Sequence, residues 1–548
     1  MTYRILAGGW LAVVAFLAQP ACAQSALDRV APSTRQPDSA PEPTPPPPDF
    51  GIVPGTPIES PAVRGEILVG AISLSGLTAL TPEQFSDVLG DYVGRTLQPA
   101  DLAMLTDRIA GRARDRGYVF ASARIAPQRL AAGVLVVEVD EGRIDRIDLE
   151  GSDNAAVRAA LAPLADGKPV TLNELQRHLL IAGDIDGIRI RQTRLVHDGN
   201  RGVLVVRVAQ DSASLRVAIR NDGTRPVGPV EIHIEAMISQ LVFADDALSV
   251  AYSSALFEPK ELQYARLRYQ KRLNSGGTEL SLASSWSSVQ PGSYLSGYEI
   301  LGRSWSQSIG LLQPLHRRRR SSIWLTASLE VNNLTQRRGG RDVRRDRETL
   351  LRAGLYGYDD LFGGRLRFNA LVSQGLDLFD ATDPGDPLAS RSDADGTFTS
   401  ANLWLEWTRT FGSGFSIRLA GNGQIASQPL LIGEEVALGG RSFLRGYDWS
   451  ERSGDEGAMG SAELRYDVKQ PLGIVDRAQF YAFGDGGVVR NLSNGTGGGS
   501  LASAGGGLRV DISHAIGATA EVAVPLTGPR YDTGNRQPRI NLGLSTAF

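Results

Sequence analysis

Apolar and charged residues alternate one by one in many short segments between Leu215 and Phe548. The segment Ala462–Val468 alternates without exception, and so do Leu508–Ile512 and Arg539–Phe548. In a β-strand this period of two places the apolar side chains on one face and the polar ones on the other. A soluble sandwich would turn the charged face outward, whereas a membrane barrel would turn the apolar face to lipid and keep a polar lumen. The connections between the segments distinguish these two folds.

Short and long connections follow one another in turn. Ser413–Gly414 and Gly473–Asp476 are examples of short ones, and Asp380–Thr397 and Gln428–Gly457 of long ones. Outer-membrane barrels have short periplasmic turns and long external loops. We therefore predict an all-β transmembrane β-barrel over residues 211–548. Its 16 antiparallel strands are expected to start near residues 215, 230, 248, 262, 278, 298, 321, 348, 365, 398, 416, 458, 477, 500, 518 and 539.

Residues 1–23 have the pattern of a secretory signal peptide. Arg4 supplies the positive charge, Ile5–Leu17 form the apolar core, and Ala21-Cys22-Ala23 form the cleavage site. Cys22 is the only cysteine of the sequence, so the exported chain is expected to contain no thiol and no disulfide. The pattern predicts a protein that leaves the cytoplasm and that meets a membrane, if at all, through strands.

An internal repeat precedes the predicted barrel. Gly133–Val139 recurs as Gly202–Val208, offset by 69 residues, and each copy closes a similar unit. Each unit has the pattern of a strand, two helices and two strands. Fixed spacing of this kind is typical of tandem modules, so we predict two small α+β (β-α-α-β-β) domains at residues 66–142 and 143–210. They resemble polypeptide-transport-associated (POTRA) domains.

Two glycine-containing motifs lie in the predicted barrel. Leu444-Arg445-Gly446-Tyr447 falls in the sixth long loop, between the eleventh and twelfth strands, and Phe483-Gly484-Asp485-Gly486-Gly487 falls on the thirteenth strand. Behind two POTRA-like modules, this pair resembles the signature motifs of the superfamily of outer-membrane assembly factors and two-partner secretion transporters. The resemblance implies that the sixth loop folds back into the barrel and that Arg445 meets Asp485 on the inner wall. The alternative is a solvated loop arginine and a flexible strand.

Glycines have predicted roles in this contact. Gly446 would allow a tight turn at the tip of the loop, because glycine adopts backbone conformations that other residues avoid. Gly484, Gly486 and Gly487 would leave the wall free of bulk where the tip docks. A guanidinium–carboxylate pair in a confined lumen can be bidentate and less screened than at an open surface.

Two modules and a barrel of this length resemble the haemolysin/haemagglutinin secretion-activation family within that superfamily. The resemblance implies a Gram-negative outer-membrane transporter with periplasmic POTRA domains. Its modules would capture an unfolded secreted exoprotein, and the barrel would pass it to the cell surface. The C-terminal aromatic Phe548 resembles the signal that the barrel assembly machinery reads. Alternatives are an outer-membrane protein insertase of the same superfamily and a passive porin with periplasmic binding domains.

Residues 24–65 form a proline-rich linker, with eleven prolines between Pro32 and Pro61, which we interpret as an extended spacer. Better-known members of the family thread an N-terminal helix through the pore as a plug. Only Gln24–Ala31 precede the prolines here, which is short for a helix that spans a barrel. We therefore expect removal of residues 24–31 to change pore conductance little.

No feature of the sequence predicts an enzyme, a cofactor or a nucleic-acid partner. The net charge is −3, the five histidines lack metal-ligand spacing, and no Lys-Ser/Thr follows Gly484–Gly487 to form a phosphate loop. Clustered arginines suggest contacts with outer-membrane lipids and lipopolysaccharide, although solvated positions explain them equally well. These are Arg317–Arg320, in a predicted periplasmic turn, and Arg337, Arg338, Arg341, Arg344, Arg345 and Arg347, in a predicted external loop.

Overall fold

The computed structural model describes residues 50–53, 66–129, 133–198 and 201–548, apart from Ile474 and His514. The predicted signal peptide and most of the linker, including residues 24–31, lie outside the described residues. No helix in these ranges is long and apolar enough to cross a membrane.

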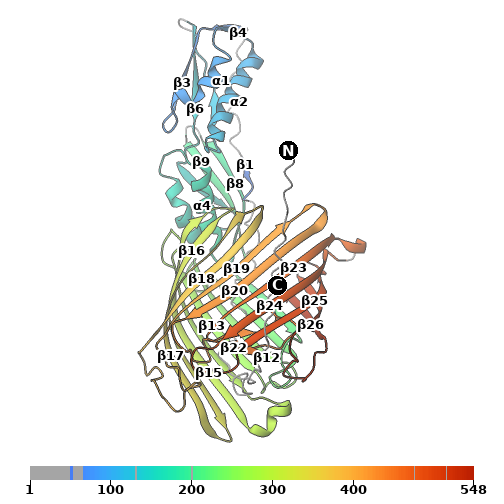
Figure 1. Cartoon of the computed structure of the whole chain (residues 1–548). Helices are drawn as coiled ribbons and strands as arrows, with labels where there is room; N and C mark the ends of the chain where they lie inside the picture. The colour runs from blue at the N-terminus through green and yellow to red at the C-terminus, as the bar shows by residue number, and fades with distance from the viewer. Residues whose placement is uncertain (1–49, 54–65, 130–132, 199–200, 474, 514) are drawn as a thin grey trace, which may run out of the picture.

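Within the described ranges, sixteen strands pair antiparallel with their neighbours and close into a barrel (Figure 1). The predicted fold is confirmed, and most strands begin within two residues of the expected positions. The strands are β10 (Ala213–Arg220), β11 (Glu231–Ser239), β12 (Asp246–Ala255), β13 (Gln263–Arg272), β14 (Glu279–Val289), β15 (Ile300–Arg317), β16 (Ser322–Arg338), β17 (Arg341–Leu361), β18 (Gly364–Leu376), β19 (Thr399–Thr410), β20 (Phe415–Ala426), β23 (Glu456–Lys469), β24 (Arg477–Arg490), β25 (Gly499–Asp511), β26 (Ile516–Pro525) and β27 (Arg539–Ala547).

The outer wall is apolar, as the alternation predicts. Leu267, Leu464 and Leu542 are each about half exposed, at 48%, 50% and 52%, whereas lumenal Glu463 is 2% exposed. A soluble sandwich would have the opposite arrangement. The barrel therefore presents an apolar belt to its surroundings and keeps its charges inside.

The largest departure in the barrel is the hairpin of β16 and β17. The sequence predicted an external loop over Arg337–Arg347, but these arginines lie on the two strands, and only Gly339 and Gly340 form the turn. Both glycines have positive φ, 55° and 77°, which a two-residue hairpin favours. The prediction of a loop is wrong because alternation continues through these polar residues, which pair across the two strands.

The barrel closes where β10 pairs with β27. The ladder runs from Arg216 opposite Ala547 to Arg220 opposite Gly543. Beyond it, Leu215 and Phe548 exchange backbone hydrogen bonds of 3.1 and 2.8 Å. At the other end, the Asn221 side chain accepts from the Leu542 amide at 2.6 Å and donates to the Ile540 carbonyl at 3.0 Å. This seam is therefore hydrogen-bonded along its length.

Each repeat folds into its own module, and the predicted element order is present. In module 1, β3 and β5 flank β6, and β2 pairs with β4, a short strand that the sequence did not predict. The elements of module 1 are β2 (Ile67–Val69), β3 (Ala71–Ser75), α1 (Ser86–Gly90), β4 (Arg95–Leu97), α2 (Pro99–Asp115), β5 (Ser122–Arg124) and β6 (Val134–Asp140). Those of module 2 are β7 (Arg146–Glu150), α3 (Ala155–Leu161), α4 (Leu172–Gly183), β8 (Ile188–Asp198) and β9 (Arg201–Gln210).

The two modules are packed against each other. Phe120 of module 1 is fully buried within the hydrophobic core of module 2. Gly142, at the junction, has a φ of +81°, and a Cβ there would lie 2.7 Å from the Cβ of Phe120. The modules are therefore joined by a shared core rather than by a free hinge.

Part of the linker is folded, so its description as a spacer is wrong for residues 50–53. Phe50 is buried in the core of module 2, and β1 (Ile52–Val53) pairs parallel with β8. The reason is that Phe50 and Ile52 interrupt the prolines with apolar side chains that can be buried, and with backbone amides, which prolines lack, that can donate to a ladder.

Module 2 also contacts the periplasmic rim of the barrel. Arg317, predicted to lie in a turn, ends β15, is 5% exposed, and donates to both carboxylate oxygens of Asp184 at 3.0 and 2.6 Å. Arg272 donates to the Asp184 carbonyl. Arg318–Arg320 remain exposed in the turn. For Arg317 the expected lipid or solvent contact is wrong, because a carboxylate of module 2 is within reach.

Candidate functional site

Loop 6, Ser427–Asp455, connects β20 to β23 and is fixed at its base by Asp455. This carboxylate is fully buried and accepts from Arg391 at 2.6 Å and from the amides of Leu430 and Leu492 at 2.7 Å each. Within the loop, β21 (Val436–Leu438) pairs with β22 (Arg452–Gly454). The residues between these strands, including the Leu444–Tyr447 motif, form the tip.

The tip brings Arg445 against Asp485 of β24. The Arg445 guanidinium donates to both carboxylate oxygens of Asp485, from Nε at 3.1 Å and from Nη2 at 3.0 Å. The Arg445 amide donates to the same carboxylate at 3.1 Å. Arg445 is 4% and Asp485 is 5% exposed. The structure thus places the two motifs in a bidentate, buried contact, the geometry in which an arginine pair is strongest.

Two further carboxylates share this guanidinium. Nη1 of Arg445 donates to Glu463 at 2.9 Å and to Glu521 at 3.3 Å. The guanidinium carbon also lies 3.4 Å from the centre of the Phe483 ring, close enough for a cation–π contact. We call the contacts of Arg445 with Asp485, Glu463 and Glu521 the Arg445 latch.

Glu463 and Glu521 were not predicted as site residues. The alternation of their strands predicts that both side chains face the lumen. It does not predict which lumenal charges contact one another. Arg509 of β25, two strands away, donates to Glu463 at 2.8 Å, and the Tyr481 hydroxyl donates to Glu521 at 3.0 Å.

The charge state of the latch follows from these neighbours. Burial alone would lower the pKa of Arg445, but the hydrogen bond and charge of Asp485, with the charges of Glu521 and Glu463, raise this pKa above its ordinary value. Arg445 therefore stays charged, and the latch is held by charge-assisted hydrogen bonds.

Gly446 lies in the predicted turn, but the reason for a glycine there differs from the one predicted. Its φ is not positive; Leu444 has the left-handed conformation, with a φ of 59°. A Cβ on Gly446 would lie 2.9 Å from the Pro525 nitrogen, the Ser503 Cβ and the Val524 carbonyl carbon. The predicted tight turn is present, because the Tyr447 amide donates to the Leu444 carbonyl at 2.9 Å, but it does not need a glycine conformation. The glycine is needed because the tip approaches the wall closely.

The three glycines of the wall motif on β24 differ in their surroundings. A Cβ on Gly487 would lie 2.9 Å from Leu438 and 3.1 Å from Leu444, so this glycine makes room for the loop. A Cβ on Gly484 or Gly486 would meet no atom within 4 Å. The predicted role in docking is wrong for these two, because they alternate with lumenal Asp485 and belong to the opposite face of β24.

Tyr447 fastens the other side of the tip. It is fully buried, and its hydroxyl lies 2.8 Å from Thr527 Oγ1 and accepts from the amides of Thr527 and Gly528 at 3.1 and 3.2 Å. Arg539, at the start of β27, donates to the Tyr447 carbonyl at 2.7 Å. The four motif residues thus contact strands and loops on both sides of the wall segment that holds Asp485.

The substitution Gly446→Ala is expected to unseat the tip. The added methyl would collide with backbone atoms of β26, which cannot move aside as a flexible side chain could. We expect increased entry of large antibiotics into cells and increased protease cleavage within loop 6. Gly484→Ala is the matched control, since its methyl enters open space, and it should behave as wild type. Equal behaviour of the two variants would contradict the close-approach argument.

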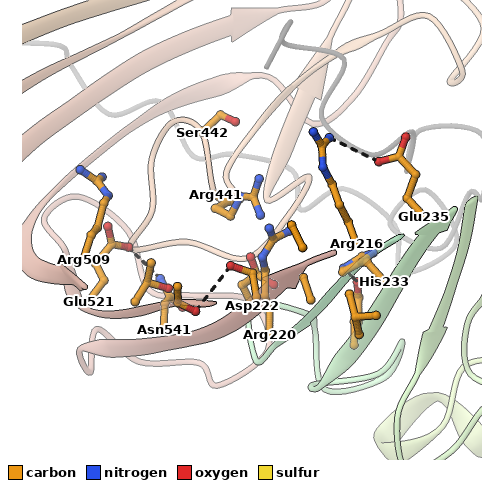
Figure 2. Close-up of a pocket in the computed structure, with 18 of the residues that line it drawn as sticks. Arg216, Arg220, Asp222, His233, Glu235, Arg441, Ser442, Arg509, Glu521 and Asn541 are labelled. Atoms are coloured by element: carbon orange, nitrogen blue, oxygen red, sulfur yellow. Dashed lines mark hydrogen bonds and ion pairs between the residues drawn. The ribbon is translucent and has the colours of Figure 1, made fainter. Parts of the chain in front are cut away.

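A cavity of about 1660 Å³ remains in the lumen on the periplasmic side of the tip. Among the described residues its lining is rich in arginine and carboxylate pairs. Figure 2 draws Arg441 and Ser442 of loop 6 in this cavity, with the Arg216–Glu235 pair and Asn541 beside Glu521. The lumen is therefore a charged cavity bounded by loop 6 rather than a packed core.

Comparison with known proteins identifies families that match both the barrel and the first module. The profile of the haemolysin secretion/activation protein family ShlB/FhaC/HecB matches residues 199–510, and that of the ShlB-type POTRA domain matches residues 67–142. The chain is 22% identical to the heme/hemopexin transporter protein HuxB of Haemophilus influenzae over 81% of this chain and 80% of that protein. It is 24% identical to the outer membrane transporter CdiB of Escherichia coli over 84% of this chain and 79% of that protein.

Solved structures share the fold. CdiB from Escherichia coli superposes with a TM-score of 0.67 at 21% identity, covering 95% of this chain and 94% of that one. BamA from Haemophilus ducreyi lacking POTRA domains 1–3 gives 0.54 at 12% identity, covering 88% and 99%. With the barrel, the modules and the family profile in agreement, the chain belongs to the haemolysin secretion/activation family ShlB/FhaC/HecB and is an outer-membrane transporter of two-partner secretion.

Proposed function

We propose that this transporter captures one unfolded exoprotein in the periplasm and passes it through the barrel lumen, with loop 6 as the gate. The observation that carries the proposal is the Arg445 latch, which holds a loop across a charged lumen by contacts that can be broken without unfolding the barrel. A transport path of this kind has to be closed at rest, and the latch supplies the closure. Opening requires Arg445 to exchange Asp485, Glu463 and Glu521 for water or for polar groups of the passenger.

Capture is assigned to the modules at residues 66–142 and 143–210. Extended polypeptides bind folded domains by adding a strand to a sheet edge, where main-chain hydrogen bonds give affinity. Both modules contain sheets with edge strands, and module 2 is joined to the barrel rim through Asp184 and Arg317. A passenger held there lies beside the entrance of the lumen. Folding of the passenger outside would drive export, so no catalytic residue and no cofactor is part of the proposal.

Two other functions, that of an insertase and that of a passive porin, fit the structure less well. An insertase would release its client sideways through the barrel wall, but the β10–β27 seam is hydrogen-bonded from Leu215 and Phe548 to Asn221. A passive porin would not need two modules that share a core and dock on the rim. Both observations favour passage through the lumen.

Further partners are proposed from the outer surface. The apolar belt fits outer-membrane lipids. The external end of the β16–β17 hairpin carries Arg338 and Arg341, both exposed, which suit lipopolysaccharide phosphates. Phe548 is 75% exposed at the end of an alternating strand, where the barrel assembly machinery could read it.

A deletion strain tests the proposed function. Without the transporter, we expect one exoprotein to disappear from the culture medium while the set of outer-membrane barrels stays unchanged. Loss of many barrels would instead identify an insertase, and an unchanged medium with altered solute uptake would identify a porin. A gene for a large secreted protein beside the transporter gene would name the passenger.

A further inference from the structure

The sheet of module 2 has an outer edge that is only partly covered. Its strand order is β1-β8-β9-β7, so β8 would be the edge strand without the linker segment (Figure 1). β8 is 11 residues long, yet β1 pairs only with Thr193 and Arg194. Most of the hydrogen-bonding groups on this side of β8 therefore have no strand partner among the described residues.

The linker segment is held mainly by one aromatic side chain. Phe50 is 3% exposed and belongs to the same buried cluster as Phe120 and Ile190. Gly51, with a φ of +51°, lets the chain bend between Phe50 and β1, and a Cβ there would lie 3.2 Å from the Arg191 carbonyl. The site thus has two parts: a pocket that takes an aromatic ring, and a ladder that takes an extended backbone.

The sequence limits how long the paired strand β1 can be. Pro54 follows Val53 directly, and Pro45–Pro48 lie just before Asp49 and Phe50. Proline cannot donate to a ladder, so the paired strand cannot grow in either direction. A longer strand without prolines could form more hydrogen bonds with the same edge. The segment is therefore a weak occupant that a better one can replace.

We propose that the outer edge of β8, together with the Phe50 pocket, is a docking site for the unfolded passenger, and that residues 50–53 are a resident strand which the passenger displaces. This inference rests on the proposed function. The matching passenger segment is extended, with an aromatic residue two positions before an aliphatic one, as in Phe50-Gly51-Ile52. Covering the edge at rest also protects it from pairing with other chains.

The exposed face of β8 adds a charge preference. Arg189, Arg191 and Arg194 lie on it. Arg189 pairs with Asp211, and Arg194 pairs with Glu150 at 2.9 Å. Since these two arginines are balanced by carboxylates, the positive charge that the face presents comes from Arg191, which gives acidic segments a small advantage over basic ones.

Competition by the resident strand sets the expected affinities. A tethered segment acts at an effective concentration on the order of millimolar, so a weak occupant can lower the apparent affinity of a competitor about tenfold. We use the synthetic peptide of residues 47–56, labelled with a fluorophore, as the probe. It should bind the full-length Phe50→Ala transporter in detergent about tenfold more tightly than it binds wild type. The same peptide with alanine at position 50 should bind neither protein.

A disulfide provides the converse test. Because Cys22, the only cysteine of the sequence, lies in the predicted signal peptide, Ile52→Cys with Thr193→Cys introduces a single possible disulfide between two ladder partners. The oxidised double variant should not bind the peptide and should export the passenger at least fivefold less than wild type. Reduction of the double variant should restore both properties, and each single variant should behave as wild type.

The outcomes separate this inference from the proposed function. Undiminished export by the oxidised variant, or equal peptide binding by wild type and Phe50→Ala, would overturn the docking site. The peptide measurement does not depend on export. A deletion strain that loses no exoprotein would therefore count against the proposed function alone.

Discussion

Replacing Arg445 by alanine is expected to reduce export about tenfold or more while the barrel stays folded in the outer membrane. The substitution leaves Asp485, whose side chain is fully buried, without its guanidinium, whereas Glu463 keeps Arg509 and Arg465. Removing one partner of a buried pair typically costs about 3–5 kcal/mol, because a charge is left uncompensated. That cost falls on the seated position of loop 6, so the tip should leave the wall and lie unanchored in the lumen, where it obstructs the passenger instead of opening and closing in a controlled way. Export is measured by immunoblotting the medium, and barrel folding by heat-dependent mobility of the transporter in gels.

Arg490→Ala is the matched control. Arg490 also lies in the external half of the barrel and pairs with Glu456, but its side chain is 75% exposed. An exposed pair contributes about 0–1 kcal/mol, so export should be unchanged. Normal export by Arg445→Ala, or an equal loss in both variants, would contradict the latch.

The shared guanidinium changes how a charge swap should be interpreted. If Arg445 met Asp485 alone, exchanging the two residues would be expected to restore the contact. In the structure, an aspartate at position 445 would face Glu463 and Glu521, which would repel it. We therefore expect Arg445→Asp with Asp485→Arg to remain defective, and neutralising Glu521 in addition should improve export.

Removing the carboxylate of Asp184 is expected to detach module 2 from the barrel rim. Asp184→Ala leaves Arg317 buried without its bidentate partner, although Arg317 keeps the Ser322 hydroxyl at 2.8 Å and lies 4.5 Å from the Trp324 ring. An uncompensated buried charge again costs about 3–5 kcal/mol. We expect faster cleavage at the junction of module 2 and the barrel by proteinase K, a protease of broad specificity, and a several-fold loss of export.

Two variants control for this effect. Arg318→Ala removes a neighbouring exposed arginine of the same turn and should leave cleavage and export unchanged. Arg317→Lys keeps the charge but loses the bidentate geometry, so it should give an intermediate result. Rapid cleavage in Arg318→Ala, or a wild-type pattern in Asp184→Ala, would show that the dock does not depend on this pair.

The sequence predicted the barrel well because a lipid-facing strand has little freedom. Each position must be apolar or polar according to its face, as Ala462–Val468 illustrates, and a slip of one residue would reverse both faces. The β16–β17 hairpin shows the limit of that rule. Beyond the membrane both faces can be polar, so strand and loop have similar compositions there, and the extension to Arg338 and Arg341 was missed.

The site was predicted less completely. The motifs identified Arg445 and Asp485 as partners, but not Glu463 and Glu521, because which lumenal charges meet depends on the stagger between strands. The glycines illustrate a second limit. A sequence shows that Gly446 and Gly484 lack side chains, but only coordinates show that one faces a crowded wall and the other open space. Phe50 was missed for a similar reason: its pocket belongs to a module that begins later in the chain.

The β10–β27 seam also has a kinetic meaning. Its ladder joins Arg216 to Ala547, the two ends of the barrel sequence, whereas every other neighbouring pair of barrel strands is joined by a local connection. The entropy of bringing such distant segments together is lost before their hydrogen bonds compensate for it. Hairpins can therefore form early and cheaply, while closure of the cylinder is the slow, committing step of biogenesis. Until that step is complete, the first and last strands present unpaired edges, and this open intermediate is the form most in need of a chaperone.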